Sequence, residues 1–316
     1  MAYRLKLNEP LDRGFRRIAT AQISRAITHV EAATEVTSIH ETRKCLKRTR
    51  ALLRFYRPAL AEASFKTFNA SLRSIGQTLS IRRDTDVLMQ TVTSLVQSAG
   101  LKRASAAQLH KAILKFRETQ TNPTGHAPDT HAIIADLLSV REALAAVVCE
   151  TDDETLITSG MARSLDTAHE TFEAAFEDSQ DEALHEWRKA VQIHWRHMQL
   201  VSAAWPAYCD ARIEEARTIS ALVGAYRDLS SLSDHINGNQ RDTGTRALVL
   251  KPALQRTVTD LIEAHKKPFH IKAKLHGERL LAEGTSGLCR RLMVYWATAA
   301  ELKGIDAAIS DSKSSN

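Results

Sequence analysis

The stretch HETRKCLKRTRALLRFYRP, residues 40–58, determines how the rest of this chain is interpreted. At 3.6 residues per turn it separates into an apolar stripe and a basic face, which predicts an amphipathic helix. The stripe predicted to face a helical core comprises Thr42, Cys45, Leu46, Thr49, Leu52, Leu53 and Tyr56. The other face carries His40, Arg43, Lys47, Arg50, Arg54 and Arg57, with Lys44 and Arg48 at its flanks. A row of cations about 25 Å long favours a linear polyanion as its partner.

The same pattern occurs again later in the chain. HETRK at residues 40–44 is repeated as HEWRK at residues 185–189, a separation of 185 − 40 = 145 residues. Each copy is followed by an Arg-Asp pair, at 83–84 and at 227–228, and these pairs are 227 − 83 = 144 residues apart. Two landmarks with nearly equal offsets indicate an internal duplication with units of about 150 residues.

Composition predicts an all-α protein. The 316 residues are 43% hydrophobic and include only 12 Gly and 7 Pro, so few breaks interrupt the long helical patterns. The net charge of +6 is modest, and the local clustering of cations is more informative than the total. Four cysteines without a CxxC pair, no secretory signal and no long apolar run predict a soluble cytoplasmic protein with reduced thiols.

The expected organisation is a single domain over residues 1–305, made of two repeats, followed by a polar tail at 306–316. The acidic stretch at 151–155 is the predicted boundary, with one helical bundle over about 10–150 and the other over about 156–303. Short connections favour up-and-down bundles. Within this scheme Ser38 is the predicted N-cap of the basic helix, and a late helix is expected over His265–Glu283.

The duplicated His-x-x-Arg-Lys helix with its later Arg-Asp pair resembles the conserved-histidine α-helical domain (CHAD) family, from about residue 10 to about residue 300. The resemblance implies two pseudo-symmetric four-helix-bundle halves facing a basic central groove. It also implies non-catalytic binding of inorganic polyphosphate, at polyphosphate granules. The second copy departs from the pattern at Gln192, which takes the place of Lys47, and at Trp195, which aligns with Arg50.

The residues predicted to bind polyphosphate are the cations of both copies. They are His40, Arg43, Lys44, Lys47, Arg48, Arg50, Arg54, Arg57, Arg83, His185, Arg188, Lys189, Arg196 and Arg227. Arginine takes two phosphate oxygens at once, while lysine acts as a mobile point charge. Cations packed on one face repel each other, so an anion should relieve strain there. Sulfate or phosphate would bind the same site, and granule proteins are further candidate partners.

Two other interpretations of the basic face remain. Glutamates on neighbouring helices could neutralise it, or it could bind the backbone of a nucleic acid such as RNA, although only 5% of the residues are aromatic. His40 and His185 fit either phosphate contacts or structural hydrogen bonds. We expect the Arg-Asp pairs to be turns in which Asp84 and Asp228 hold neighbouring cations or cap a helix.

No enzyme or cofactor motif is present in the sequence. It contains no GxxxxGK[ST], GxSxG, HExxH or Glu-x-Glu-x-Lys pattern, so we expect no enzymatic activity and no cofactor. Two weaker metal patterns are Asp84-x-Asp86 and the i, i+3 pair His194 and His197, neither with further ligands. A metal-dependent phosphohydrolase is therefore a third and less favoured function. Trp187, Trp195 and Trp205 are expected in the core.

Overall fold

The computed structural model describes residues 3–32, 36–79, 84–99, 101, 103–120, 129–149, 151–177, 181–238 and 248–314. Within these ranges the regular structure is entirely helical, which confirms the predicted all-α class. The elements are α1 (Leu11–Glu31), α2 (Val36–Phe55), the 3-10 helix η1 (Arg57–Ala59), α3 (Glu62–Thr78), α4 (Asp84–Ala99), α5 (Arg103–Gln120), α6 (Thr130–Ala145), α7 (Asp153–Glu177), α8 (Asp181–Leu200), α9 (Pro206–Asn237), α10 (Pro252–Leu281) and α11 (Thr285–Ser314). None of the described helices is long and apolar enough to span a membrane.

Helix α2 forms as its pattern predicts. All the residues of the apolar stripe are at most 2% exposed. Thr42 and Thr49 can lie in this core because their hydroxyls donate to carbonyls one turn earlier, those of Ser38 (2.9 Å) and Cys45 (3.1 Å). The predicted N-cap is wrong, since α2 begins at Val36 and Ser38 lies within it.

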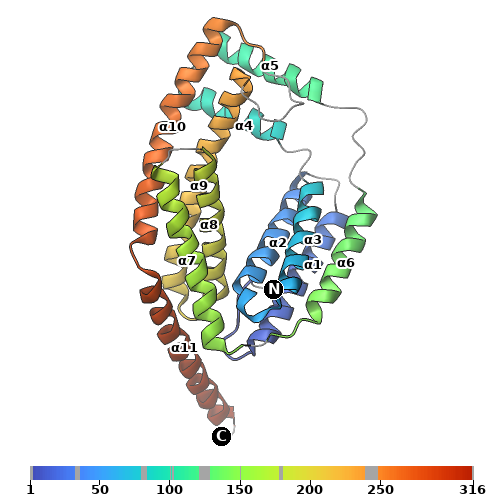
Figure 1. The fold of residues 1–316 in the computed structure, drawn as a ribbon, viewed down its shortest axis with the longest axis vertical. Coiled ribbons are helices and arrows are strands. Elements are labelled where there is room, and N and C mark those ends of the chain that lie inside the picture. The colour runs from blue at the N-terminus through green and yellow to red at the C-terminus, as the bar shows by residue number, and fades with distance from the viewer. Residues whose placement is uncertain are drawn as a thin grey trace.

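Two groups of helices stand side by side (Figure 1). Helices α1, α2, α3 and α6 form the first bundle, and α7, α8, α9 and α10 form the second, with α11 packed against α7. Helices α2 and α8 start 181 − 36 = 145 residues apart and end 200 − 55 = 145 residues apart. One continuous apolar core includes residues of both bundles.

The bundles touch where α2 meets α7 and α8. The His197 ring lies between two backbone carbonyls, with Nε2 3.0 Å from the Ala51 oxygen and Nδ1 3.2 Å from the Gly160 oxygen. The Phe55 ring meets His197 edge-on, with ring centroids 5.2 Å apart. From this contact α2 and α8 diverge toward their N-terminal ends (Figure 1).

A second apolar core packs α4 and α5 against the second bundle. Helices α4 and α5 leave the first bundle and pack on the ends of α9 and α10 (Figure 1). The fully buried side chains of this crossing core are Val92, Leu109, Ile113, Leu232, Val258 and Ile262. Helices α4 and α5, which follow the first three helices in the chain, therefore pack on the second bundle.

Two local structures expected from the sequence are wrong, at the Arg227-Asp228 pair and at His265. Helix α9 continues to Asn237, so the Arg227-Asp228 pair lies inside a helix and not in a turn. Helix α10 begins at Pro252 and continues through Pro268, so no separate helix starts at His265. The predicted polar tail from residue 306 is helical as far as Ser314.

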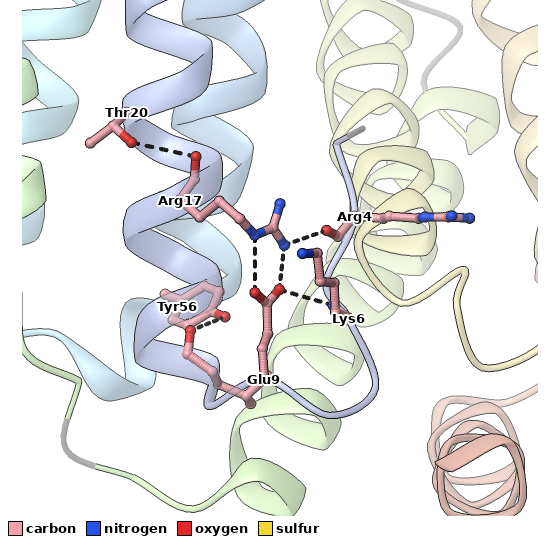
Figure 2. Close-up of polar contacts among 7 residues, drawn as sticks. Arg4, Lys6, Glu9, Arg17, Thr20 and Tyr56 are labelled. Carbon is pink, nitrogen blue, oxygen red and sulfur yellow. Dashed lines mark hydrogen bonds and ion pairs between the residues drawn. The ribbon is translucent and has the colours of Figure 1, made fainter. Parts of the chain in front are cut away.

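The N-terminal segment ties the two bundles together. The Leu5 amide donates to the Leu200 carbonyl at the end of α8 (2.9 Å). Figure 2 shows Arg17 of α1 holding this segment, with Nε donating to Glu9 Oε2 (3.0 Å) and Nη2 donating to the Arg4 carbonyl (3.0 Å). Residues 3–9 thus cross from α1 to the second bundle in a defined conformation.

Candidate anion-binding site

The contact between the bundles partly covers the basic face of α2. Ala51 and Phe55 lie on the side of α2 that meets α7 and α8, and they are 1% and 0% exposed. The cations next to them therefore lose water on one side, while Lys44 and Lys47 nearer the N-terminus stay exposed. A cation that has lost water depends most on hydrogen bonds and counter-charges from its neighbours, because burying an unpaired charge costs free energy.

Three arginines gather beside this contact. Arg50 Nε donates to Asn69 Oδ1 of α3 (3.0 Å), and Arg54 Nη1 donates to the Arg50 carbonyl (3.0 Å). Arg196 of α8 is only 9% exposed and donates from Nη1 to the Gln192 carbonyl (2.5 Å). The Arg196 guanidinium also stacks on the Trp195 ring, 4.8 Å from its centroid.

Within the described parts of the chain, the positive charge of this arginine cluster is not compensated by a carboxylate. Among the residues described by the structure, no carboxylate forms an ion pair with Arg50, Arg54 or Arg196. Burial, followed by the charges of Arg50, Arg57 and Arg196, lowers the pKa of Arg54 to about 10. Burial likewise lowers the pKa of Arg196 to about 10. Both groups remain charged at neutral pH, so burying this cluster opposes folding.

Other predicted cations are partly neutralised by glutamates. Arg57 forms a bidentate pair with Glu62 of α3, with Nε 3.0 Å from Oε2 and Nη2 2.7 Å from Oε1. Lys44 pairs with Glu41 at 2.7 Å. Lys189 pairs with Glu186 in the same i, i+3 arrangement. Neutralisation by a glutamate of a neighbouring helix therefore holds for Arg57, whereas Lys44 and Lys189 pair within their own helices. The arginine cluster has no such partner among the described residues.

A second group lies near the N-terminal end of α8. Arg188 Nε donates to the Ser220 carbonyl (2.9 Å) and Oγ (3.3 Å) of α9. The guanidinium lies directly over Gly224, where an added Cβ would come within 2.8 Å of Arg188 Nη2. Gln192, which replaces the cation of the first copy, donates to Ser220 Oγ (2.8 Å). Helix α9 thus fixes the direction of Arg188.

His185 favours its neutral form. Its Nδ1 accepts a hydrogen bond from Arg227 Nη1. Burial, and after it the charges of Arg227 and Lys189, lower the pKa of His185 to about 4. His185 thus makes a hydrogen bond within the protein, which is one of the two roles expected for it from the sequence.

The remaining predicted site residues are placed as follows. Arg83 lies outside the described residues, and so does the side chain of Asp84. His40 and Arg43 are half-buried on the basic face of α2. The carbonyl of Arg48 accepts a hydrogen bond from the Tyr3 hydroxyl (2.8 Å), and Tyr3 interacts electrostatically with both Arg48 and Arg196. The structure thus gathers one group at the bundle contact and one at the N-terminal end of α8.

Sequence reasoning missed three residues of this site. Asn69 binds Arg50, Arg73 of α3 contributes to lowering the pKa of Arg50, and Tyr3 lies near Arg48 and Arg196. Arg73 carries a weak signal as an exposed cation on α3. Asn69 and Tyr3 carry none, because only tertiary packing brings them to the basic face.

The weaker metal pattern on α8 is structural. His194 Nδ1 lies 3.1 Å from Ser164 Oγ, and both nitrogens of His197 face backbone carbonyls. No group of three or more His, Cys, Asp or Glu side chains in the described ranges is arranged to hold a metal ion. Trp187 is fully buried as expected, whereas Trp205 is 48% exposed, so the core prediction is wrong for Trp205.

Comparison with known proteins agrees with this architecture. The CHAD domain of the plant Ricinus communis superposes with a TM-score of 0.61 at 16% identity, covering 90% of this chain and 96% of that one. PptA from Streptomyces chartreusis superposes with a TM-score of 0.57 at 15% identity, covering 86% of this chain and 99% of that one.

At these identities the two structures show a shared fold alone. No curated protein sequence matches this one. The CHAD domain profile matches residues 17–237, which is more than half of the sequence and includes both basic helices. The chain therefore belongs to the CHAD domain family.

Proposed function

We propose that this protein binds inorganic polyphosphate along the basic face of α2 and the facing side of α8. The observation that carries the proposal is the pair Arg54 and Arg196, two buried, interacting guanidinium groups that form no ion pair with a carboxylate of the described residues. A buried charge without a partner costs several kcal/mol, and phosphate oxygens would supply the partner. Arginine also suits phosphate because its planar donors match two oxygens at once.

A chain of phosphates fits the cations better than a single phosphate does. From His40 to Arg54 the face of α2 extends about 21 Å, and from His185 to Arg196 the face of α8 extends about 16 Å. A linear polyanion with one charge per phosphate can reach the arginine cluster and the Arg188 group together. RNA is less suited because the site offers no open stacking platform, since Arg196 covers the Trp195 ring.

The proposed function is binding without hydrolysis. The site concentrates cations, and hydrolysis of polyphosphate would instead need acidic metal-binding groups around the chain. A protein with this property would gather at polyphosphate granules and retain or recruit other components there.

A salt-titrated competition tests the proposal. Labelled long-chain polyphosphate is bound to the protein and challenged with RNA at the same phosphate concentration, over a range of salt. Both ligands should show a salt slope, because both release counterions. We expect polyphosphate to remain bound in excess RNA. Displacement by an equal phosphate concentration of RNA would contradict a dedicated polyphosphate site and favour nucleic-acid binding.

The double variant Arg54→Met and Arg196→Met connects binding to the cluster. We expect affinity for polyphosphate to fall at least about tenfold, while the anion-free protein becomes about 1–2 kcal/mol more stable because two desolvated charges are removed. Arg103→Met, an exposed site on α5, is the control and should change neither property. Unchanged affinity in the double variant would contradict the proposal that Arg54 and Arg196 bind polyphosphate. A loss of stability would show that the two charges are paired in solution.

A further inference from the structure

A separate pocket lies on the other side of the bundle contact. Its volume is about 310 Å³, within the range of small-molecule sites. Its walls come from the N-terminal segment, α1, α2, the end of α8 and α9. The lining residues are Tyr3, Arg4, Arg25, Arg48, Gln199, Ser202, Asp210, Ile213 and Arg217. Only Arg48 belongs to the predicted polyphosphate face.

The arginines of this pocket are available to a ligand. The side chains of Arg4, Arg25 and Arg48 form no hydrogen bond or ion pair with another residue in the described parts of the chain. Arg217 makes only a long, exposed contact with Glu214 (3.5 Å). Four arginines that line one hollow are suited to a phosphate group.

The pocket wall is held in place by the N-terminal segment. Arg17 binds the Arg4 carbonyl, the Leu5 amide binds Leu200, and the Tyr3 hydroxyl binds the Arg48 carbonyl. Figure 2 shows the Arg4 side chain directed away from the Glu9–Arg17 pair. The Arg4 guanidinium is therefore presented by a fixed backbone.

The other lining residues distinguish this pocket from the polyphosphate face. The Asp210 carboxylate and the Gln199 side-chain amide have no hydrogen-bond partner among the described residues. Asp210 would repel a bare polyphosphate but accept hydrogen bonds from hydroxyl or amino groups. Tyr3 and Ile213 add apolar surface. A ligand with phosphate at one end and hydroxyl or amino donors at the other would give hydrogen-bond partners to both the arginines and the Asp210 carboxylate.

We infer that this pocket binds a phosphorylated small molecule that carries hydroxyl or amino groups, of the sugar-phosphate or nucleotide class. The site does not depend on the proposed polyphosphate function. Because Arg48 lines the pocket and also interacts with Tyr3 next to Arg196, a ligand phosphate there lowers the positive potential of the arginine cluster. Occupation of the pocket should therefore weaken polyphosphate binding.

Titration calorimetry with four probes tests the inference: ribose 5-phosphate, adenosine 5′-monophosphate, inorganic phosphate and tripolyphosphate. We expect at least one of the first two to bind about tenfold more tightly than inorganic phosphate. Preference for adenosine 5′-monophosphate over ribose 5-phosphate would indicate contact with the base, and equal affinity would indicate a sugar-phosphate site. Equal and weak binding of all four would overturn the inference.

Variants separate this pocket from the polyphosphate face. The double variant Arg25→Ala and Arg217→Ala should lose the preferred probe about tenfold while keeping long-chain polyphosphate affinity within about threefold. Asp210→Asn should remove the preference over inorganic phosphate. If Asp210→Asn instead strengthens every probe, the pocket is only an extension of a general anion surface. Arg103→Ala, at an exposed arginine on α5 outside both sites, is the control for nonspecific loss of charge.

Discussion

At the scale of single residues, His185 reports directly on whether an anion occupies the site. Its ordinary pKa is about 6.5, and in the folded protein burial, Arg227 and Lys189 lower the pKa to about 4. The unfolded chain therefore takes up the proton first, and His185 removes stability as pH falls from 6.5 toward 4. A bound polyanion opposes the neighbouring positive charges, so it should raise this pKa and cause proton uptake.

We predict that the pKa of His185 rises by at least about one unit when tripolyphosphate is added. Histidine ring signals followed by NMR from pH 3.5 to 8 would measure the pKa, with the His185 signal identified by its loss in His185→Gln. Arg227→Met should raise the pKa in the anion-free protein, because it removes the nearest positive charge. An unchanged pKa at saturating tripolyphosphate would place the bound anion away from the N-terminal end of α8.

At the scale of elements, the contact between α7 and α2 depends on one glycine. A Cβ on Gly160 would lie 2.8 Å from Phe55 Cδ2 and 2.9 Å from the Phe55 carbonyl oxygen. We predict that Gly160→Ala lowers the free energy of unfolding by about 1–3 kcal/mol, because backbone on both sides must shift. Gly76 on α3 is the matched control, since its added Cβ meets only Leu46 Cδ1 at 3.8 Å.

Urea unfolding of the two variants would measure the difference. Gly76→Ala should be neutral or stabilising by up to about 1 kcal/mol, as expected for alanine inside a helix. Equal stability of the two variants would show that α7 and α2 are not closely packed at Gly160 in solution. Polyphosphate affinity should fall in Gly160→Ala alone, because Arg54 and Arg196 lie next to this contact.

Periodicity in the sequence predicts which face of a helix is buried, but not which other helix covers that face. The stripe of α2 and the start of α8 follow from periodicity, because burial on one face of a helix is a local property. Arg196 could not be aligned with a cation of the first copy, since its counterpart is Ala51 (196 − 145 = 51). Its role comes from the way α8 crosses α2. The sequence also does not predict that α4 and α5 pack on the second bundle, because an apolar stripe does not identify the bundle that covers it.

At the scale of the whole molecule, α2 and α8 lie close at one end, and the helices that follow α3 in the chain pack on the second bundle at the other. At one end α2 packs on α7 and α8, and at the other end the crossing core ties α4 and α5 to α9 and α10 (Figure 1). The cations along α2 and α8 can act on one ligand only if this spacing is maintained. Binding should therefore depend on residues in the crossing core that do not touch the ligand.

We predict that Ile113→Ala in the crossing core destabilises the protein by about 2–5 kcal/mol and also weakens polyphosphate binding. Leu137→Ala in α6 is the matched control, since Leu137 and Ile113 are both 0% exposed and Leu137 packs inside the first bundle. Leu137→Ala should cost similar stability and leave affinity nearly unchanged under conditions where both variants are folded. Binding measured with long-chain polyphosphate and with tripolyphosphate separates the two effects, because only the long chain must reach both helices. Equal loss of affinity for both lengths would indicate general loosening, whereas a loss confined to the long chain would show that the crossing core sets the distance between α2 and α8.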